Sequence, residues 1–303
     1  MAILFALLAS TSWGTVDFLG GLASRRAHPV AVTFTSEGIA FLLLVPVTLV
    51  VKGAPSATDI GLGLVAGIGG ALALTLFYRA LAVGRMSVVA PITGATTATV
   101  PVIAGVILGE RPGPGALAGI LGALVAIALV SAGTGPSLVE AGPPDPEIAE
   151  PPAPSAPAAP AAGPRPPRLG EVPLSILCGA LFGSFLVLIH QTGDDSGLWP
   201  LTASFAGGVA AVAVLARFLS SPLLAPRVVA PMMVTAGILG AGGGVLYVAA
   251  THSGLLSVVA VLSSLYPAVT VGLARVVLHE RFGRVQALGL ALAAISIVLL
   301  GSG

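Results

Sequence analysis

Two stretches of 25 residues decide the fold: SVVAPITGATTATVPVIAGVILGER at 87–111 and SVVAVLSSLYPAVTVGLARVVLHER at 257–281. Both begin with Ser-Val-Val-Ala and end with Glu-Arg, and each residue of the first corresponds to the residue 170 positions later. Chance matches are frequent in a chain so rich in Ala, Gly, Val and Leu, so these two shared motifs carry the most weight. The chain therefore contains an internal repeat with an offset of 170 residues.

The composition indicates a membrane protein. Hydrophobic residues make up 56% of the chain and charged residues only 8%, whereas soluble domains carry roughly 25% charged residues. So few charged residues cannot cover the surface of a soluble protein, whereas lipid can solvate an apolar protein surface. The net charge of +1 offers no basic face for nucleic acid. The single cysteine, Cys178, excludes an internal disulfide framework and a cysteine-based metal site.

Ten apolar segments are each long enough, at about 20 residues, to cross a membrane as a helix. Short connections predict antiparallel neighbours, and the first span lacks the basic start of a cleaved signal peptide. The segments are 2–22, 30–51, 60–83, 86–108, 114–133, 172–191, 199–219, 229–251, 255–278 and 285–302.

The fold class predicted is an all-α membrane protein with ten transmembrane helices, arranged as two five-helix repeats at 1–133 and 172–303. Residues 134–171 are rich in Pro and Ala and carry acidic residues; such a segment buries too little apolar area to fold and is predicted to be a linker. Because each repeat has an odd number of spans, the two enter the membrane in opposite senses, which makes an inverted repeat.

Basic residues predict the orientation. We call the side that carries the connections after spans 1, 3, 5, 7 and 9 side X, and the opposite side Y. Side Y keeps only Lys52 and Arg111. The positive-inside rule therefore places side X in the cytoplasm and both termini outside. The basic residues of side X are Arg25, Arg26, Arg79, Arg85, Arg165, Arg168, Arg217, Arg227, Arg275, Arg281 and Arg284.

Several motifs resemble the EamA-type repeat of the drug/metabolite transporter superfamily. They are Trp13-Gly14, the runs 77–84 and 108–111, and their counterparts 246–254 and 278–281. The resemblance covers both membrane halves but not the linker. It implies a ten-span carrier in the cell inner membrane, with a central cavity, that moves small metabolites outward. It also implies cytoplasmic termini, opposite to the arginine count.

Three ionisable residues inside apolar spans are candidates for function, because each costs about 2.5–3.5 kcal/mol at a span centre. Glu37 lies roughly 10 Å deep at 1.5 Å per residue, and Asp17 and Arg79 lie toward the same side of the membrane. We expect a carboxylate linked to protons or substrate, with Arg79 as a cationic partner. The alternative is a static ion pair that holds the first three spans together.

The fourth and ninth spans predict a polar cavity, because both combine hydroxyl side chains with helix-breaking prolines. The alternative is that the hydroxyls bond to their own helix. Aromatic residues are candidates for the cavity wall or for anchoring at the membrane interface. The predicted lining residues are Thr93, Thr96, Thr97, Ser263, Ser264, Tyr266, Trp13, Tyr78 and Tyr247, and the predicted hinges are Pro91, Pro101 and Pro267.

Polar residues at the span ends are expected to be structural. His190, His252 and Asp194-Asp195 suggest a metal site or a pH gate, but their spacing matches no metal signature, which favours a solvated loop. Glu110 and Glu280 are each expected to favour the dipole of the following helix. No glycine–lysine phosphate loop is present, so neither ATP-driven transport nor a cofactor is expected.

The sequence as a whole predicts a secondary carrier that works by alternating access and exports a small polar metabolite such as an amino acid or amine, with protons as a candidate coupling ion. Its partners are the solute and the lipid bilayer. One alternative is a non-transporting membrane scaffold or sensor. An intramembrane enzyme is the other, but no nucleophile–base or metal constellation has convincing spacing. The substrate and the oligomeric state stay open.

Overall fold

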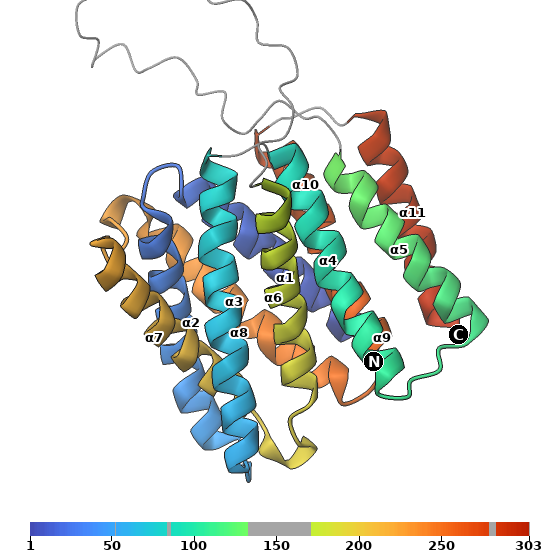
Figure 1. The fold of residues 1–303 in the computed structure, drawn as a ribbon, viewed down its shortest axis with the longest axis horizontal. Coiled ribbons are helices and arrows are strands. Elements are labelled where there is room, and N and C mark those ends of the chain that lie inside the picture. The colour runs from blue at the N-terminus through green and yellow to red at the C-terminus, as the bar shows by residue number, and fades with distance from the viewer. Residues whose placement is uncertain (52, 84–85, 133–170, 279–282, 303) are drawn as a thin grey trace, which may run out of the picture.

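The computed structural model describes residues 1–51, 53–83, 86–132, 171–278 and 283–302, and in this part of the chain every regular element is helical (Figure 1). Two short 3-10 turns, η2 (Asp194–Ser196) and η3 (Arg227–Val229), lie in connections. The α-helices are α1 (Ala2–Ala23), α2 (Pro29–Val50), α3 (Ala57–Val83), α4 (Met86–Ile107), α5 (Pro114–Ala132), α6 (Glu171–His190), α7 (Trp199–Leu219), α8 (Ala230–Thr251), α9 (Leu256–Ser263), α10 (Tyr266–Leu278) and α11 (Arg284–Ser302).

The predicted apolar segments agree with the helices to within three residues at each end. In the described part of the chain, seven helical stretches are long and apolar enough to cross a membrane. Three shorter apolar helices, Ile92–Ile107, Pro114–Val130 and Arg284–Leu300, occupy three further predicted spans. The prediction of a helical, multi-pass membrane chain is therefore confirmed. The predicted linker lies outside the described residues, apart from Glu171 at the start of α6.

The ninth predicted span is divided at Ser264–Leu265 into α9 and α10. Pro267 has no N–H to donate to the carbonyl of Ser263, and the Ala268 N–H bonds to the Leu265 carbonyl instead of continuing the α-helical pattern (2.9 Å). The equivalent span in the first half stays one continuous helix, α4, despite Pro91 and Pro101. Of the three predicted hinge prolines, only Pro267 therefore adjoins a break in the helix.

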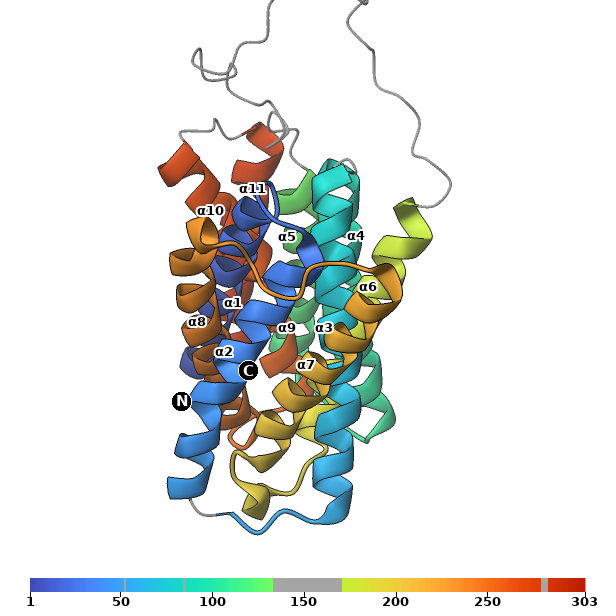
Figure 2. The same ribbon diagram turned by 90° about the vertical axis from the view of Figure 1, so that its left-hand side faces the viewer.

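The two halves of the chain interlock. In the first half α3 packs against α6 and α7, while in the second half α8 packs against α1 and α2. Likewise α4 packs against α6, and α1 packs against α9 and α10. At one edge of the bundle α5 runs alongside α11 (Figure 1), and Figure 2 shows the same interleaving from the side. Most of the core is therefore made of contacts between halves.

Glycines allow the closest of these approaches, between α3 and α7. A Cβ atom at Gly67 would collide with the carbonyl group of Ser204, and one at Gly207 would lie 2.6 Å from the carbonyl oxygen of Leu64. The corresponding approach of α8 to α2 uses Gly237, whose Cβ would lie 2.9 Å from the carbonyl oxygen of Ser36. Small residues at such crossings let helix backbones pack directly against each other.

Candidate functional site

A cavity lies where the two halves meet. It has a volume of about 130 Å³ and is lined by α1, α2, α3, α4, α6, α7, α8, α9 and α10. A single buried water needs roughly 10–15 Å³ on the same measure, so the cavity has room for a small solute. The paired helices α5 and α11 contribute no lining residue. The described structure therefore has a central chamber built by both halves, with α5 and α11 outside it.

Asp17 of α1 and Glu37 of α2, the two acids predicted to lie inside apolar spans, both line this cavity. Neither has an ion-pair partner among the described residues, and Arg79 is exposed on α3 and does not line the cavity. The carboxylate of Glu37 lies against Gly208 of α7, where a Cβ would be 2.8 Å from Glu37 Oε2. The two acids are thus brought together without the predicted cationic partner.

Aromatic side chains form much of the remaining wall. Trp13 lines the cavity and meets the ring of Phe185 edge-on, with ring centroids 6.4 Å apart. The Trp13 ring also packs over Gly243, where a Cβ would lie 2.8 Å from its Nε1, so a larger residue at this position would displace it. Trp13 and Tyr266 were predicted from the sequence to line a cavity, whereas the other aromatic wall residues, Phe182, Phe185 and Phe205, were not.

The hydroxyl residues that were predicted to line the cavity fall into two groups: some present unpartnered hydroxyls to it, and others bond to their own helix. Ser263 and Ser264, at the break between α9 and α10, line the cavity, are 0% and 1% exposed, and their hydroxyl oxygens have no hydrogen-bond partner. Thr97 lines the cavity but its hydroxyl donates to the carbonyl of Thr93 (2.8 Å). Thr96 likewise bonds to its own helix, at Ile92 (2.7 Å). Back-bonding, the alternative weighed for these threonines, is therefore what Thr96 and Thr97 do.

Three predicted lining residues are buried away from the cavity and tie helices together. Thr93 donates to the carbonyl of Ser175 on α6 (3.2 Å). The hydroxyl of Tyr78 donates to the carbonyl of Val16 on α1 (3.4 Å), and that of Tyr247 donates to the carbonyl of Leu186 on α6 (2.8 Å). Both tyrosines are at most 1% exposed, so interface anchoring does not apply to them.

We expect Tyr247→Phe to lower the free energy of unfolding by about 1 kcal/mol, because it removes a short, buried hydrogen bond between helices. Tyr78→Phe removes a bond of 3.4 Å, which is weaker, and serves as the matched comparison with the smaller expected loss. Thermal unfolding in detergent measures both. Because phenylalanine keeps the ring, no loss of stability in either variant would show that the two tyrosines stabilise the bundle through ring packing alone.

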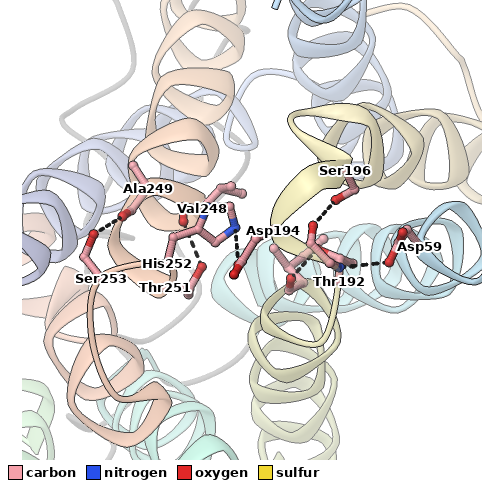
Figure 3. Close-up of polar contacts among 11 residues, drawn as sticks. Asp59, Thr192, Asp194, Ser196, Val248, Ala249, Thr251, His252 and Ser253 are labelled. Carbon is pink, nitrogen blue, oxygen red and sulfur yellow. Dashed lines mark hydrogen bonds and ion pairs between the residues drawn. The ribbon is translucent and has the colours of Figure 1, made fainter. Parts of the chain in front are cut away.

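At side Y, polar contacts join the connections of the two halves (Figure 3). Asp59, at the start of α3, accepts hydrogen bonds from the backbone N–H groups of Ser56 (2.8 Å) and of Gly193 in the second half (2.9 Å). The Ala54 N–H donates to the carbonyl of Asp195 (2.8 Å). These bonds hold the α2–α3 connection against the α6–α7 connection.

The histidines and aspartates singled out at span ends belong to the same region. His252 Nε2 lies 3.6 Å from Asp194 Oδ1 (Figure 3), whereas His190 Nδ1 is buried without a hydrogen-bond partner. Within the described residues no three His, Cys, Asp or Glu side chains are grouped so that they could hold a metal ion.

Glu110 makes a contact that the sequence analysis did not anticipate. Its carboxylate accepts hydrogen bonds from the N–H groups of Leu256 and of Ser257 (3.0 Å for the latter). It therefore caps α9 in the other half rather than the helix that follows it in sequence, and favours the positive end of the α9 dipole. Its repeat counterpart, Glu280, lies outside the described residues.

Glu110→Gln is expected to lower the free energy of unfolding by about 1–2 kcal/mol, because it removes the charge that strengthens both capping bonds. Asp194→Asn provides a comparison at the same end of the bundle. The Asp194 side chain is 87% exposed, and exposed ion pairs contribute little, so almost no change is expected. Thermal unfolding of both variants measures the difference, and a Glu110→Gln protein as stable as the parent would contradict a capping role.

Some of the cavity-lining residues that were not predicted could have been inferred from the sequence, and others could not. Phe182 and Gly183 correspond to Trp13 and Gly14 in the repeat, so Phe182 could have been found by transferring the role of Trp13 to the second half. Ser204 and Phe205 carry no such signal, because α7 has apolar or small residues around most of its circumference.

Comparison with known proteins agrees with this architecture. A crystal structure of another protein is similar over 98% of this chain and 95% of its own, with a TM-score of 0.69 and 18% sequence identity. At that identity the likeness shows the fold alone. No curated protein sequence matches the chain. The model of the EamA-like transporter family matches residues 1–132 and 169–302, which is most of the chain. The chain belongs to the EamA-like transporter family.

Proposed function

We propose that the protein is a secondary carrier that moves a small polar metabolite, such as an amino acid or amine, outward across the cell inner membrane without ATP. The observation that carries the proposal is the central cavity, which presents the carboxylates of Asp17 and Glu37 to a solute-sized space between two halves. Intramembrane acids are costly and typically mark substrate or proton pathways. Either a proton or a cationic solute neutralises such a carboxylate, so proton coupling is part of the proposal.

We also propose that the chain has ten spans arranged as two inverted repeats. Reciprocal contacts support this arrangement. Gly14 of α1 faces Val269 of α10, where a Cβ would lie 2.6 Å from the Cβ of Val269. The equivalent Gly183 of α6 faces Val100 of α4, at 2.7 Å from its Cβ. The bonds made by Tyr78 and Tyr247 correspond in the same way. Such a repeat places a binding site at the interface of its halves.

Alternating access requires an end of the bundle that opens and closes. At side Y the two halves are joined by the bonds of Asp59 to Gly193 and of Glu110 to α9, in addition to the backbone bond from Ala54. These contacts would break if one half rocked against the other. The break at Ser264–Leu265, beside Pro267, supplies a place where α9 can move with the side-Y loops while α10 keeps its position.

The proposal is tested by transport into liposomes that contain the purified protein and an internal pH-sensitive dye. A panel of amino acids and amines is added outside, one at a time, with and without an imposed proton gradient. We expect at least one solute to give a dye signal that protein-free liposomes lack and that Glu37→Gln abolishes. Failure of every solute to give a protein-dependent signal, both with and without the proton gradient, would overturn the proposal.

A further inference from the structure

We infer that the cavity selects an organic ammonium ion with an apolar or aromatic body, and that it discriminates against anions and against zwitterions that carry a carboxylate. The inference narrows the solute of the proposed carrier from an amino acid or amine to an amine, and so rests on that function for its role in transport. The binding selectivity itself is a property of the cavity and can be measured without transport.

The charges of the lining favour a cation. Asp17 and Glu37 both face the cavity, and among the described residues that line it there is no Lys, Arg or His. The predicted counter-charge, Arg79, is exposed elsewhere on α3. Between helices, where the effective dielectric constant is low, an anion would meet uncompensated like charge, whereas an ammonium group would pair with a carboxylate.

The aromatic wall suits the rest of such a solute. Trp13, Phe185 and Tyr266 come from three different helices and line the same cavity as the two acids. An ammonium group within about 6 Å of an aromatic face gains roughly 0.5–2 kcal/mol, most over Trp, and an apolar body gains from leaving water. A hydrophilic metabolite without an apolar part would leave most of this wall unused.

The polarity of the break between α9 and α10 adds to the preference for a cation. The buried hydroxyls of Ser263 and Ser264 line the cavity without a partner, and Pro267 supplies no N–H for the carbonyl of Ser263. The end of α9 thus offers acceptors at the negative pole of a helix dipole. The two serine hydroxyls can donate hydrogen bonds as well as accept them, but the start of α10 adds few backbone donors, because Pro267 has none and the N–H of Ala268 is already bonded to Leu265.

The test compares three probes that share a phenyl ring on a short alkyl chain and differ in charge: phenethylamine, phenylalanine and 3-phenylpropionate. The chain has two tryptophans, of which Trp13 lines the cavity and Trp199 begins α7. In a Trp199→Phe protein the fluorescence therefore reports on the cavity alone. We expect phenethylamine to bind at least tenfold more tightly than phenylalanine, and 3-phenylpropionate to show no saturable change.

Two variants locate the charge selectivity. Glu37→Gln and Asp17→Asn, each made in the Trp199→Phe protein, are expected to weaken phenethylamine binding at least tenfold. Asp195→Asn removes an exposed acid of the α6–α7 connection and is expected to leave it unchanged. Thermal unfolding of each variant checks that a loss of binding does not come from a loss of structure.

The outcomes separate this inference from the proposed function. Phenylalanine or 3-phenylpropionate binding as tightly as the amine, or no saturable binding of the amine, would overturn the cation selectivity, and solute movement in the liposome assay would still support a carrier. Amine binding that both acid variants retain would also overturn the inference, because the selectivity would then not arise from these carboxylates. Amine-selective binding without movement of any solute would uphold the site and contradict the carrier.

Discussion

Replacing Gly67 with alanine is expected to lower the free energy of unfolding by more than about 3 kcal/mol and to reduce the yield of folded protein sharply. The added Cβ would occupy the position of the Ser204 carbonyl group, which is backbone and cannot rotate away as a side chain would. Helices α3 and α7 would have to separate, and overpacking that shifts side chains and backbone typically costs about 1–3 kcal/mol and occasionally more. Thermal unfolding in detergent and the fraction recovered as a single species measure the effect.

Gly61→Ala on the same helix is the matched control. A Cβ at Gly61 meets nothing within 4 Å, and alanine is the better helix former by up to about 1 kcal/mol. We therefore expect this variant to be as stable as the parent or slightly more stable. Similar melting temperatures for Gly67→Ala and Gly61→Ala would show that α3 and α7 are not held as closely as described.

Glu37→Gln is expected to reduce solute transport at least tenfold while leaving the protein folded. Breaking a buried ion pair typically costs 3–5 kcal/mol, because the remaining partner is left unpaired. Glu37 has no ion-pair partner among the described residues, so amide substitution leaves no charge stranded. Stability and transport therefore respond differently, which separates a coupling role from the static ion pair that the sequence left open.

The measurement pairs initial transport rates in liposomes with thermal unfolding of the same preparations. Asp195→Asn controls for the loss of an acid outside the cavity. A Glu37→Gln protein that transports normally would remove this carboxylate from the mechanism, and one that melts far below the parent would favour the static ion pair instead.

The helices could be predicted from sequence because a membrane imposes a length on every apolar run. Segments such as 199–219 were located to the residue, since α7 begins at Trp199 and ends at Leu219. The membrane also makes buried charge costly, and for this reason Asp17 and Glu37 were predicted to be functional residues. Both line the cavity. Both results follow from the free energy of placing single residues in lipid.

Contacts between helices could not be predicted in the same way. A helix that is apolar on all sides does not indicate which of its faces packs against a neighbouring helix. Consecutive residues on a helix point about 100° apart, so once Tyr78 faces α1, Arg79 cannot also face that contact. For the same reason, the sequence did not indicate that Phe185 and Phe205 face the cavity. Glu110 was assigned to the helix that follows it, and only the spatial neighbour reveals that it caps α9.

The interlocking of the halves has a consequence for how the chain is made. Ribosomes deliver α1 to α5 to the membrane before α6 emerges, so for that interval the faces of α1 and α3 that later contact α8, α6 and α7 have only lipid beside them. Asp17 and Glu37 then sit in the bilayer without the chamber that later surrounds them. Insertion of the second-half helices that line the chamber, α6 to α10, is thus the step of biosynthesis that shelters both acids.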